Sequence, residues 1–199
     1  EWCADQVQLE IENDVLDLVF GNSIWSSSAT PSILWSSDAA DPFGDVETGM
    51  DTVAKAIGRE PNTGVIGRGL WRYAKNHPDV IDRMKGGATT ANPAKASLEA
   101  FAALVGLERV LLAGAIEDTS LEGAASTLAY VGGNHMALLY VPTGPALDVP
   151  SAGYTFMWKT FEVNRYREEQ EHADVVEARA SWDAKVTSSV SGYLIKSAA

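Results

Sequence analysis

Residues 61–87 read PNTGVIGRGLWRYAKNHPDVIDRMKGG, and this stretch decides how the rest of the chain is arranged. Residues 63–66 are few and apolar, which predicts a short interior strand. Gly67 and Gly69 allow a tight turn out of this strand, because glycine adopts backbone conformations that are closed to other residues. A helix is expected next, and it ends ahead of Pro78, which disfavours helical backbone for the residue before it and can itself open a second short helix.

The composition indicates a globular protein and argues against an extended nucleic-acid-binding surface. The chain has 199 residues, 46% of them hydrophobic, which is enough for one large domain or two small ones with a real core. Its net charge is −12, whereas affinity for nucleic-acid phosphates depends mainly on Lys and Arg. Cys3 has no second cysteine to pair with, so an internal disulfide is excluded. The sequence has neither an apolar run of the ~20 residues that cross a bilayer nor a signal-peptide pattern, so no membrane partner is expected.

Two helices are expected ahead of the central stretch. Residues 5–20 place apolar side chains on one helical face, although part of the stretch also alternates as a strand would, and helix is the favoured interpretation. Residues 42–57 carry a single apolar stripe at spacings of three and four. Asp41 is a good N-cap, Pro42 suits the first helical position, and Gly58 suits the end.

The segment between these helices, residues 21–41, is rich in serine and is predicted to be a loop. It contains Trp25 and Trp35, and a loop with two tryptophans is seldom free in solution. The favoured interpretation is that both indoles fix the loop to the body of the protein. Contact with a partner is the alternative.

The stretch that follows predicts the remainder of a small α/β sheet. After a break at Gly86 and Gly87, residues 88–105 predict a loop that ends in a helix. Residues 109–116 form a nearly continuous apolar run, typical of a strand covered on both faces, and residues 136–141 predict a second buried strand. The polar residues between these two strands predict an exposed excursion. Together with the strand of the central stretch, they predict a sheet covered by helices.

The sequence changes character at Pro150. Residues 154–163 alternate with the period of a strand, and residues 175–182 predict the strand that returns beside it. The charge-dense residues 165–174 are expected to form the turn of this long hairpin. Further short strands are expected up to the C-terminus, and the whole β-rich element is predicted to stand apart from the α/β sheet.

The sequence lacks a recognisable catalytic, cofactor-binding or metal-binding pattern. The three histidines have no carboxylate or cysteine at ligand spacing, and none of the serines lies in a nucleophile elbow. The glycines around Gly67 match neither the GxGxxG nor the Walker pattern. No cofactor is therefore expected. The remaining enzymatic alternative is a small α/β enzyme or anion-binding domain that uses the turn at Gly67 and Gly69.

Four sequence blocks carry a family resemblance: residues 41–87, which open with DPFGDVETGM, then LVGLERVLLAGAI at 104–116, MALLYVPTGPALDVPSAGYTFMW at 136–158 and GYLIKSAA at 192–199. In this order they resemble the major capsid proteins of tailed double-stranded DNA phages. That family has the Hong Kong 97-type fold, which encapsulin shells share. The resemblance covers the chain from about residue 41 onward and contains no single diagnostic motif.

The resemblance implies an α+β fold in two parts. Residues 1–60 and 150–199 would form a peripheral domain, with an N-terminal helix, a loop, a long spine helix and a long β-hairpin. Residues 61–149 would form an α/β axial domain that meets its neighbours around five-fold and six-fold axes. The family carries an N-terminal arm and an extended loop ahead of the spine helix. These parts are expected either upstream of Glu1 or, in reduced form, in residues 21–41.

The implied function is structural, and no enzymatic activity is expected. The chain would assemble with copies of itself, as hexamers and pentamers, into an icosahedral shell that encloses double-stranded DNA without specific contacts. Portal and scaffolding proteins are further expected partners, and the virion, assembled in the bacterial host cytoplasm, is the expected location. An encapsulin-like compartment that holds cargo enzyme is the alternative within the same fold.

Contacts between subunits are expected at charged and aromatic residues that have no evident role within a single subunit. Charged side chains at the predicted hairpin turn could form ion pairs between subunits, although an ordinary solvated turn is an equally good interpretation, because exposed pairs contribute only ~0 to 1 kcal/mol each. The candidate interface residues are Trp25, Trp35, Trp158, Arg165, Arg167, Glu168 and Glu169, with Glu171 a further member of the charged group.

Overall fold

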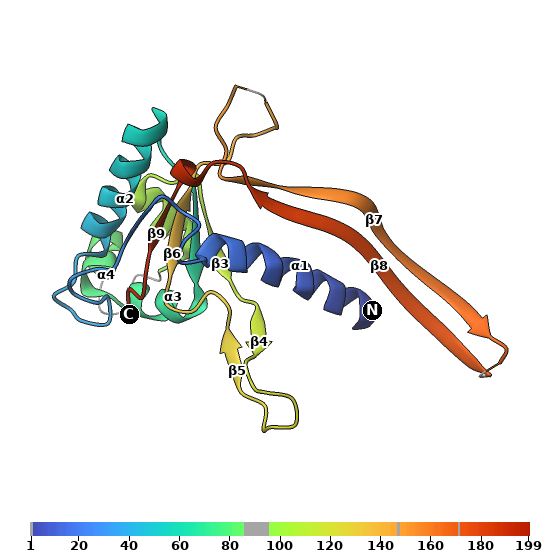
Figure 1. The fold of residues 1–199 in the computed structure, drawn as a ribbon. Coiled ribbons are helices and arrows are strands. Elements are labelled where there is room, and N and C mark those ends of the chain that lie inside the picture. The colour runs from blue at the N-terminus through green and yellow to red at the C-terminus, as the bar shows by residue number, and fades with distance from the viewer. Residues whose placement is uncertain (1, 86–95, 147, 171) are drawn as a thin grey trace.

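The computed structural model describes residues 2–85, 96–146, 148–170 and 172–199. It consists of a body built on a five-stranded sheet and a long β-hairpin that projects from the body (Figure 1). The strand order in the sheet is β1-β9-β6-β2-β3. These strands are β1 (Ser27–Ala29), β2 (Thr63–Gly67), β3 (Arg109–Ala113), β6 (Met136–Leu139) and β9 (Gly192–Ile195).

The sheet is mixed, and its central strands are buried on both faces. β6 runs antiparallel to both β2 and β9, whereas β2 pairs with β3, and β9 with β1, in parallel. Every residue of β2, β6 and β9 is buried. The predicted interior strand at residues 63–66 is therefore confirmed, and the one expected at residues 136–141 is confirmed as far as Leu139, where β6 ends.

Two expectations about strands are wrong. β3 ends at Ala113 and forms one edge of the sheet, where Leu111 is 49% exposed, so residues 109–116 are not a strand covered on both faces. β9 lies inside the α/β sheet, between β1 and β6, so the C-terminal β-rich segment does not stand wholly apart from it. The two errors have a related cause: an apolar run signals burial, but the sequence does not reveal which sheet a strand joins or whether it lies at the edge of that sheet.

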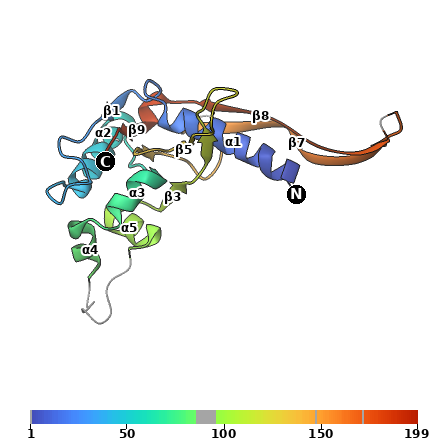
Figure 2. The same cartoon turned by 90° about the horizontal axis from the view of Figure 1, so that it is seen from below.

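Helices cover both faces of the sheet (Figures 1 and 2). One face packs against α2 (Pro42–Ile57), α3 (Arg68–Ala74), α4 (Pro78–Met84) and α5 (Leu98–Val105). The other packs against the C-terminal end of α1 (Trp2–Phe20), through Leu16 and Phe20. Alternate residues of each buried strand supply the two cores, as the period of a strand requires: Ile66 belongs to the first core and Val65 to the second.

The ends of α2 follow the predicted capping signals. The Asp41 carboxylate accepts a hydrogen bond from the Gly44 backbone N–H at 3.0 Å, and Pro42 is the first residue of the helix. Gly58 ends it in the left-handed conformation, at φ 69°, and donates its N–H to the Ala54 carbonyl at 2.8 Å. The predicted helix at residues 42–57 is confirmed at both ends.

The other helices also begin and end close to the expected residues. The helix expected at residues 5–20 is confirmed by α1, and Pro78 opens α4 as predicted. α5 ends at Val105 and is followed by Gly106 at φ 87°. Its N-cap Ser97, which the sequence analysis did not identify, accepts from the Ala100 N–H at 3.1 Å. The predicted break at Gly86 and Gly87 and the loop at 88–95 lie outside the described residues.

The projecting hairpin is formed by β7 (Gly153–Glu168) and β8 (Ala173–Val186), and it is longer than expected. The residues predicted to be its turn, 165–174, continue the strands almost to the tip, since Arg165 pairs with Val176 and Glu168 with Ala173. A high density of charge is typical of a turn, but it also suits a strand whose two faces both meet water. A smaller hairpin, β4 (Ile116–Asp118) with β5 (Leu128–Tyr130), fills the predicted exposed excursion.

Candidate assembly surfaces

An irregularity in β7 places Trp158 outside the strand ladder. Met157 pairs with Trp182 and Lys159 with Ser181, so Trp158 has no partner across the hairpin. Its side chain is 88% exposed, and both Met157 and the nearby Phe156 are exposed. A β-bulge of this kind re-aims a side chain, here into solvent. An exposed apolar group of this size on a projecting arm is typical of a contact surface for another molecule.

The hairpin tip carries a small network of ion pairs within the chain. Arg165 lies 3.1 Å from Asp174, and Arg167 lies 3.5 Å from Asp174 and 3.6 Å from Glu169. All of these side chains are largely exposed, so each pair contributes little to stability. Asp174, the acceptor shared by both arginines, was not singled out from the sequence. It occupies the register position opposite Arg167, a pairing that depends on where the turn falls.

Two further charged candidates, Glu168 and Glu171, belong to the predicted turn. Glu168 ends β7 and is exposed, and it makes no ion pair with any described residue. Glu171 lies outside the described residues. The structure therefore brings Arg165, Arg167 and Glu169 together at the tip, about a shared aspartate.

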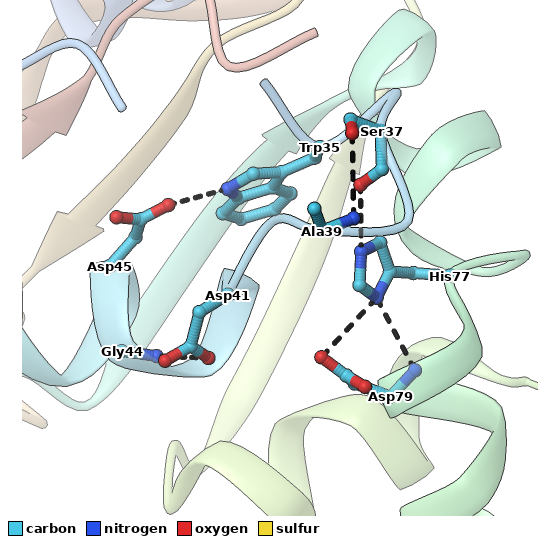
Figure 3. A network of polar contacts seen from close by, with 8 residues as sticks. All are labelled: Trp35, Ser37, Ala39, Asp41, Gly44, Asp45, His77 and Asp79. Atoms are coloured by element: carbon cyan, nitrogen blue, oxygen red, sulfur yellow. Dashed lines mark hydrogen bonds and ion pairs between the residues drawn. The ribbon is translucent and has the colours of Figure 1, made fainter. Parts of the chain in front are cut away.

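Trp25 and Trp35 are buried in their own chain, in agreement with the favoured interpretation that they fix the loop. The Trp25 indole N–H donates to the Val19 carbonyl at 2.7 Å. Trp35 is 1% exposed, and its indole N–H donates to the Asp45 carboxylate at 2.8 Å (Figure 3). Burial removes both indoles from the surface that another subunit could reach, so Trp158 is the exposed member of the three candidate tryptophans.

The same loop is held at a second point by His77, which is buried. Its Nε2 lies 3.2 Å from the Ser37 carbonyl, and its Nδ1 accepts from the Asp79 N–H at 3.3 Å (Figure 3). The histidine thus ties the loop to the start of α4, in addition to standing just before Pro78.

The root of the projecting hairpin is braced by α1, which lies beside β8 in both views (Figures 1 and 2). The Trp182 indole N–H donates to the Asp14 carboxylate at 2.9 Å, which fixes one point of contact. An apolar hollow of about 160 Å³ lies between the two elements, lined by Leu18, Val19, Tyr154 and Val186 among others. The Tyr154 hydroxyl is buried and makes no hydrogen bond to any described residue. This joint positions the arm relative to the body.

The β4–β5 hairpin forms a further exposed apolar surface, which the sequence analysis did not single out. Leu121 is 84% exposed, and Ile116, Leu128 and Tyr130 are also exposed. Its loop is closed by Asp118, whose carboxylate accepts from the Ser120 and Thr127 N–H groups and from the Ser126 hydroxyl. These bonds, the one from Ser126 first, hold the pKa of Asp118 well below its usual range. Isolated leucines in an otherwise polar excursion were the signal that could have revealed this surface.

The space beside the turn at Gly67 and Gly69, which the enzymatic alternative would use to bind an anion, is filled by other residues of the chain. A side chain at Gly67 would collide with the carbonyl oxygens of Gly132 and Gly133, and one at Gly69 would collide with the Asn134 side-chain oxygen. Close approach of the two turns thus accounts for both glycines without a bound anion. The described residues contain no group of three or more His, Cys, Asp or Glu side chains that could hold a metal ion. None of the helices in the described part of the chain is long and apolar enough to cross a membrane.

Comparison with known proteins identifies the family that this architecture resembles. No family model matches the chain. The major capsid protein of Burkholderia phage BcepMu is 28% identical over 201 residues, which cover 96% of this chain. The chain is similar to phage major capsid proteins. This relative confirms the resemblance predicted from the sequence blocks. The chain spans 63% of the relative's length, that is, less than two thirds.

Solved structures add a likeness in fold to this capsid-like sequence. A phage-related protein of Bordetella bronchiseptica RB50 superimposes with a TM-score of 0.82, at 24% identity, over 98% of this chain and 64% of that one. A structure of Mycobacterium phage Che8 matches with a TM-score of 0.58, at 13% identity, over 97% of this chain and 60% of that one. A virus-like particle from Pyrococcus furiosus matches with a TM-score of 0.55, at 8% identity, over 96% of this chain and 63% of that one. The mixed helix and sheet architecture is therefore shared with this phage-related protein, the phage Che8 structure and the virus-like particle.

Proposed function

We propose that this chain is a structural, shell-forming part of a phage major capsid protein. The observation that carries the proposal is the similarity to the BcepMu major capsid protein, which extends over 96% of the chain. The projecting arm, with Trp158 exposed on it, supports the proposal, because a monomer gains nothing from an apolar side chain held away from its own core. The proposed role is self-association, without catalysis.

The proposed subunit is of the Hong Kong 97 type. In this assignment α2 is the spine helix, residues 1–60 and 150–199 form the peripheral domain, and residues 61–149 form the axial domain. The arm of β7 and β8 projects from the body, whereas α2, β1 and β9 of the proposed peripheral domain pack in the body with the strands of the proposed axial domain (Figure 1). β9 would join the two parts, because it follows the arm in the sequence and pairs with β6 of the body.

The proposed partners are copies of the same chain, arranged as hexamers and pentamers in an icosahedral shell around double-stranded DNA. The net charge of −12 favours a shell that encloses DNA without gripping it. Portal and scaffolding proteins are proposed as further partners. The proposed location is the virion, with assembly in the bacterial host cytoplasm.

The likeness to the Pyrococcus furiosus particle favours a second candidate, an encapsulin-like compartment. It rests on a TM-score of 0.55 at 8% identity, which is weaker support than the phage relative provides. The two functions differ in what the particle contains. Nuclease-protected DNA in purified particles would favour the capsid, and an enclosed enzyme would favour the compartment.

The test of assembly is a measurement of size on the protein expressed from its native gene. Sedimentation velocity and negative-stain imaging should reveal rings, sheets or closed shells, which are far larger than one 21.3 kDa chain. A monodisperse monomer at all concentrations would contradict the proposal. That result, together with measurable phosphate binding, would favour a small enzyme or anion-binding domain.

A further inference from the structure

Three cations gather on one face of α3, in a chain that is acidic overall. Arg68 and Arg72 belong to α3, and Lys75 is its C-cap in helical conformation. The three are spaced by four and three residues, so they lie on the same side of the helix. Together with Leu112 and Tyr130 they line a groove of about 550 Å³, here called the basic groove. All three cations are exposed. The groove therefore offers positive charge beside apolar surface.

These cations have no acidic partner in the part of the chain that the structure describes. Among the residues that the structure describes, none of the three lies within ion-pair distance of a carboxylate. Arg68 lies over the Tyr130 ring, 5.8 Å from its centroid, and Arg72 lies over the Tyr73 ring at 5.1 Å. Both guanidinium groups are thus held in place by aromatic rings while their charge remains unpaired. A site held in this way is ready for an anionic partner.

A groove of opposite charge lies along the exposed side of α2. Glu47 and Asp51, one helical turn apart, line it with Glu60, and the apolar part of its lining includes Met50 and Val105. Its volume is about 600 Å³, and it is here called the acidic groove. Asp51 is paired with Lys55 at 2.7 Å, an exposed pair on the same helix.

We propose that the basic groove of one copy receives the acidic groove of the next copy. This inference rests on the proposed shell-forming function and names the two faces that join neighbouring subunits. The two grooves share no lining residue, and both views place α2 and α3 at separate positions on the body (Figures 1 and 2). A contact between two different faces repeats from head to tail, and it closes into a ring when the rotation between copies allows.

The spacing of the charges fits a contact between two helices. Arg68 and Arg72 are one turn apart on α3, as Glu47 and Asp51 are on α2, so two ion pairs can form at once when the helices lie side by side. Apolar side chains border the charges on both grooves. This combination favours a protein partner over nucleic acid, because a net charge of −12 repels a polyanion whereas apolar surface gains from burial against protein.

The test is a charge swap in the protein expressed from its native gene. The first variant carries Arg68→Glu, Arg72→Glu and Lys75→Glu, and the second carries Glu47→Lys, Asp51→Lys and Glu60→Lys. Each should reduce the assembled fraction at a given concentration by on the order of tenfold or more, because like charges then face each other. A third variant combines all six substitutions and keeps the wild-type net charge. It should assemble again, since the complementarity is restored with its sign reversed.

The controls separate loss of contact from loss of fold. Circular dichroism and urea unfolding should match the wild type, and the milder variant Arg72→Gln with Lys75→Gln serves if the triple reversal does not fold. Lys85→Glu, a reversal outside both grooves, should assemble normally.

Normal assembly of either triple variant, or no recovery in the combined variant, would overturn this inference and leave the shell function standing. Loss of retained DNA with intact particles would likewise overturn it, in favour of a nucleic-acid surface. A wild type that never assembles would remove the proposed function itself.

Discussion

At the scale of single residues, the three candidate tryptophans divide into two buried side chains, Trp25 and Trp35, and one exposed side chain, Trp158. Trp35 packs in the main core and donates its indole N–H to Asp45, which also places a polar partner at the buried end of the ring. Trp158 lies on the arm with almost no protein around it. The two residues therefore offer a matched pair for substitution.

Trp35→Ala should destabilise the fold by about 3–5 kcal/mol, because it removes a fully buried aromatic side chain and leaves a cavity. Trp158→Ala should change the free energy of unfolding by no more than ~0.5 kcal/mol, as is usual for exposed positions. Urea denaturation of both variants measures the difference. Equal effects of the two substitutions would contradict the burial described here.

Trp158 should matter instead for association. Trp158→Ser, assayed by sedimentation at matched concentration, should lower the assembled fraction on the order of tenfold, because an exposed aromatic anchor commonly carries 1–2 kcal/mol or more of an interface. The matched control is Thr155→Ala, another exposed position on β7. Wild-type assembly of the Trp158 variant would show that the bulge does not present a contact.

His135, directly before the start of β6, contacts residue Ser197 after β9 and should make stability depend on pH. Its Nδ1 accepts the Ser197 N–H at 3.0 Å, and burial, with the nearby Lys196 charge, lowers its pKa from the ordinary value of 6.5. As the pH falls below that value, the unfolded chain takes up a proton that the folded chain resists, so this residue's contribution to stability is lost on acidification. The contribution is fully present above the unfolded pKa.

The free energy of unfolding, measured at about pH 7.5 and at about pH 5.5, should therefore fall more in the wild type than in His135→Gln. The glutamine variant keeps a hydrogen-bond acceptor but cannot titrate. Carboxylates titrate in both proteins and cancel in the comparison. An identical decrease in the two proteins would show that His135 is not protonated differently in the folded chain.

At the scale of elements, signals that act within a few residues were predictable from the sequence. The N-cap Asp41, Pro42 and Gly58 set both ends of α2, and Pro78 separates α3 from α4, because capping and proline geometry are local effects. The length of the hairpin and the shared role of Asp174 were not predictable, since register depends on pairing between distant residues. Of the proposed interface, the sequence indicated the arm but not the grooves on α2 and α3.

Asp41→Ala should cost about 1 kcal/mol, because a Gly44 N–H at the start of α2 would lose its acceptor. Asp38→Ala removes another exposed carboxylate, which caps no helix, and it should leave the urea midpoint unchanged. If both substitutions shift the midpoint equally, net charge rather than capping is responsible.

At the scale of the whole molecule, the body depends on segments from both halves of the sequence. β9 pairs with β6 and β1, and the Ala198 N–H donates to the Asn134 carbonyl at 2.9 Å. The sequence revealed which segments are buried but not that β9 would enter the sheet between strands that precede it by so many residues. Contacts of this kind leave no local pattern.

Deletion of residues 192–199 should prevent stable folding of the body. The change removes a strand that is buried along its whole length and leaves the hydrogen-bonding groups of β6 and β1 without a partner. Loss of near-ultraviolet circular dichroism and rapid proteolysis are the expected results. As a control, deletion within the exposed loop between β4 and β5, residues 121–125, should leave the body folded.

The position of β9 between β1 and β6 also determines when the body sheet can form during translation. The slot between β1 and β6 stays open until residue 195 has left the ribosome, so a nascent chain carries its arm and both helical layers before its sheet can close. A polypeptide that stops before β9 would therefore fail to form the body and be removed by proteases. Copies that lack β9 would not enter a particle, so the sheet itself selects against truncated chains.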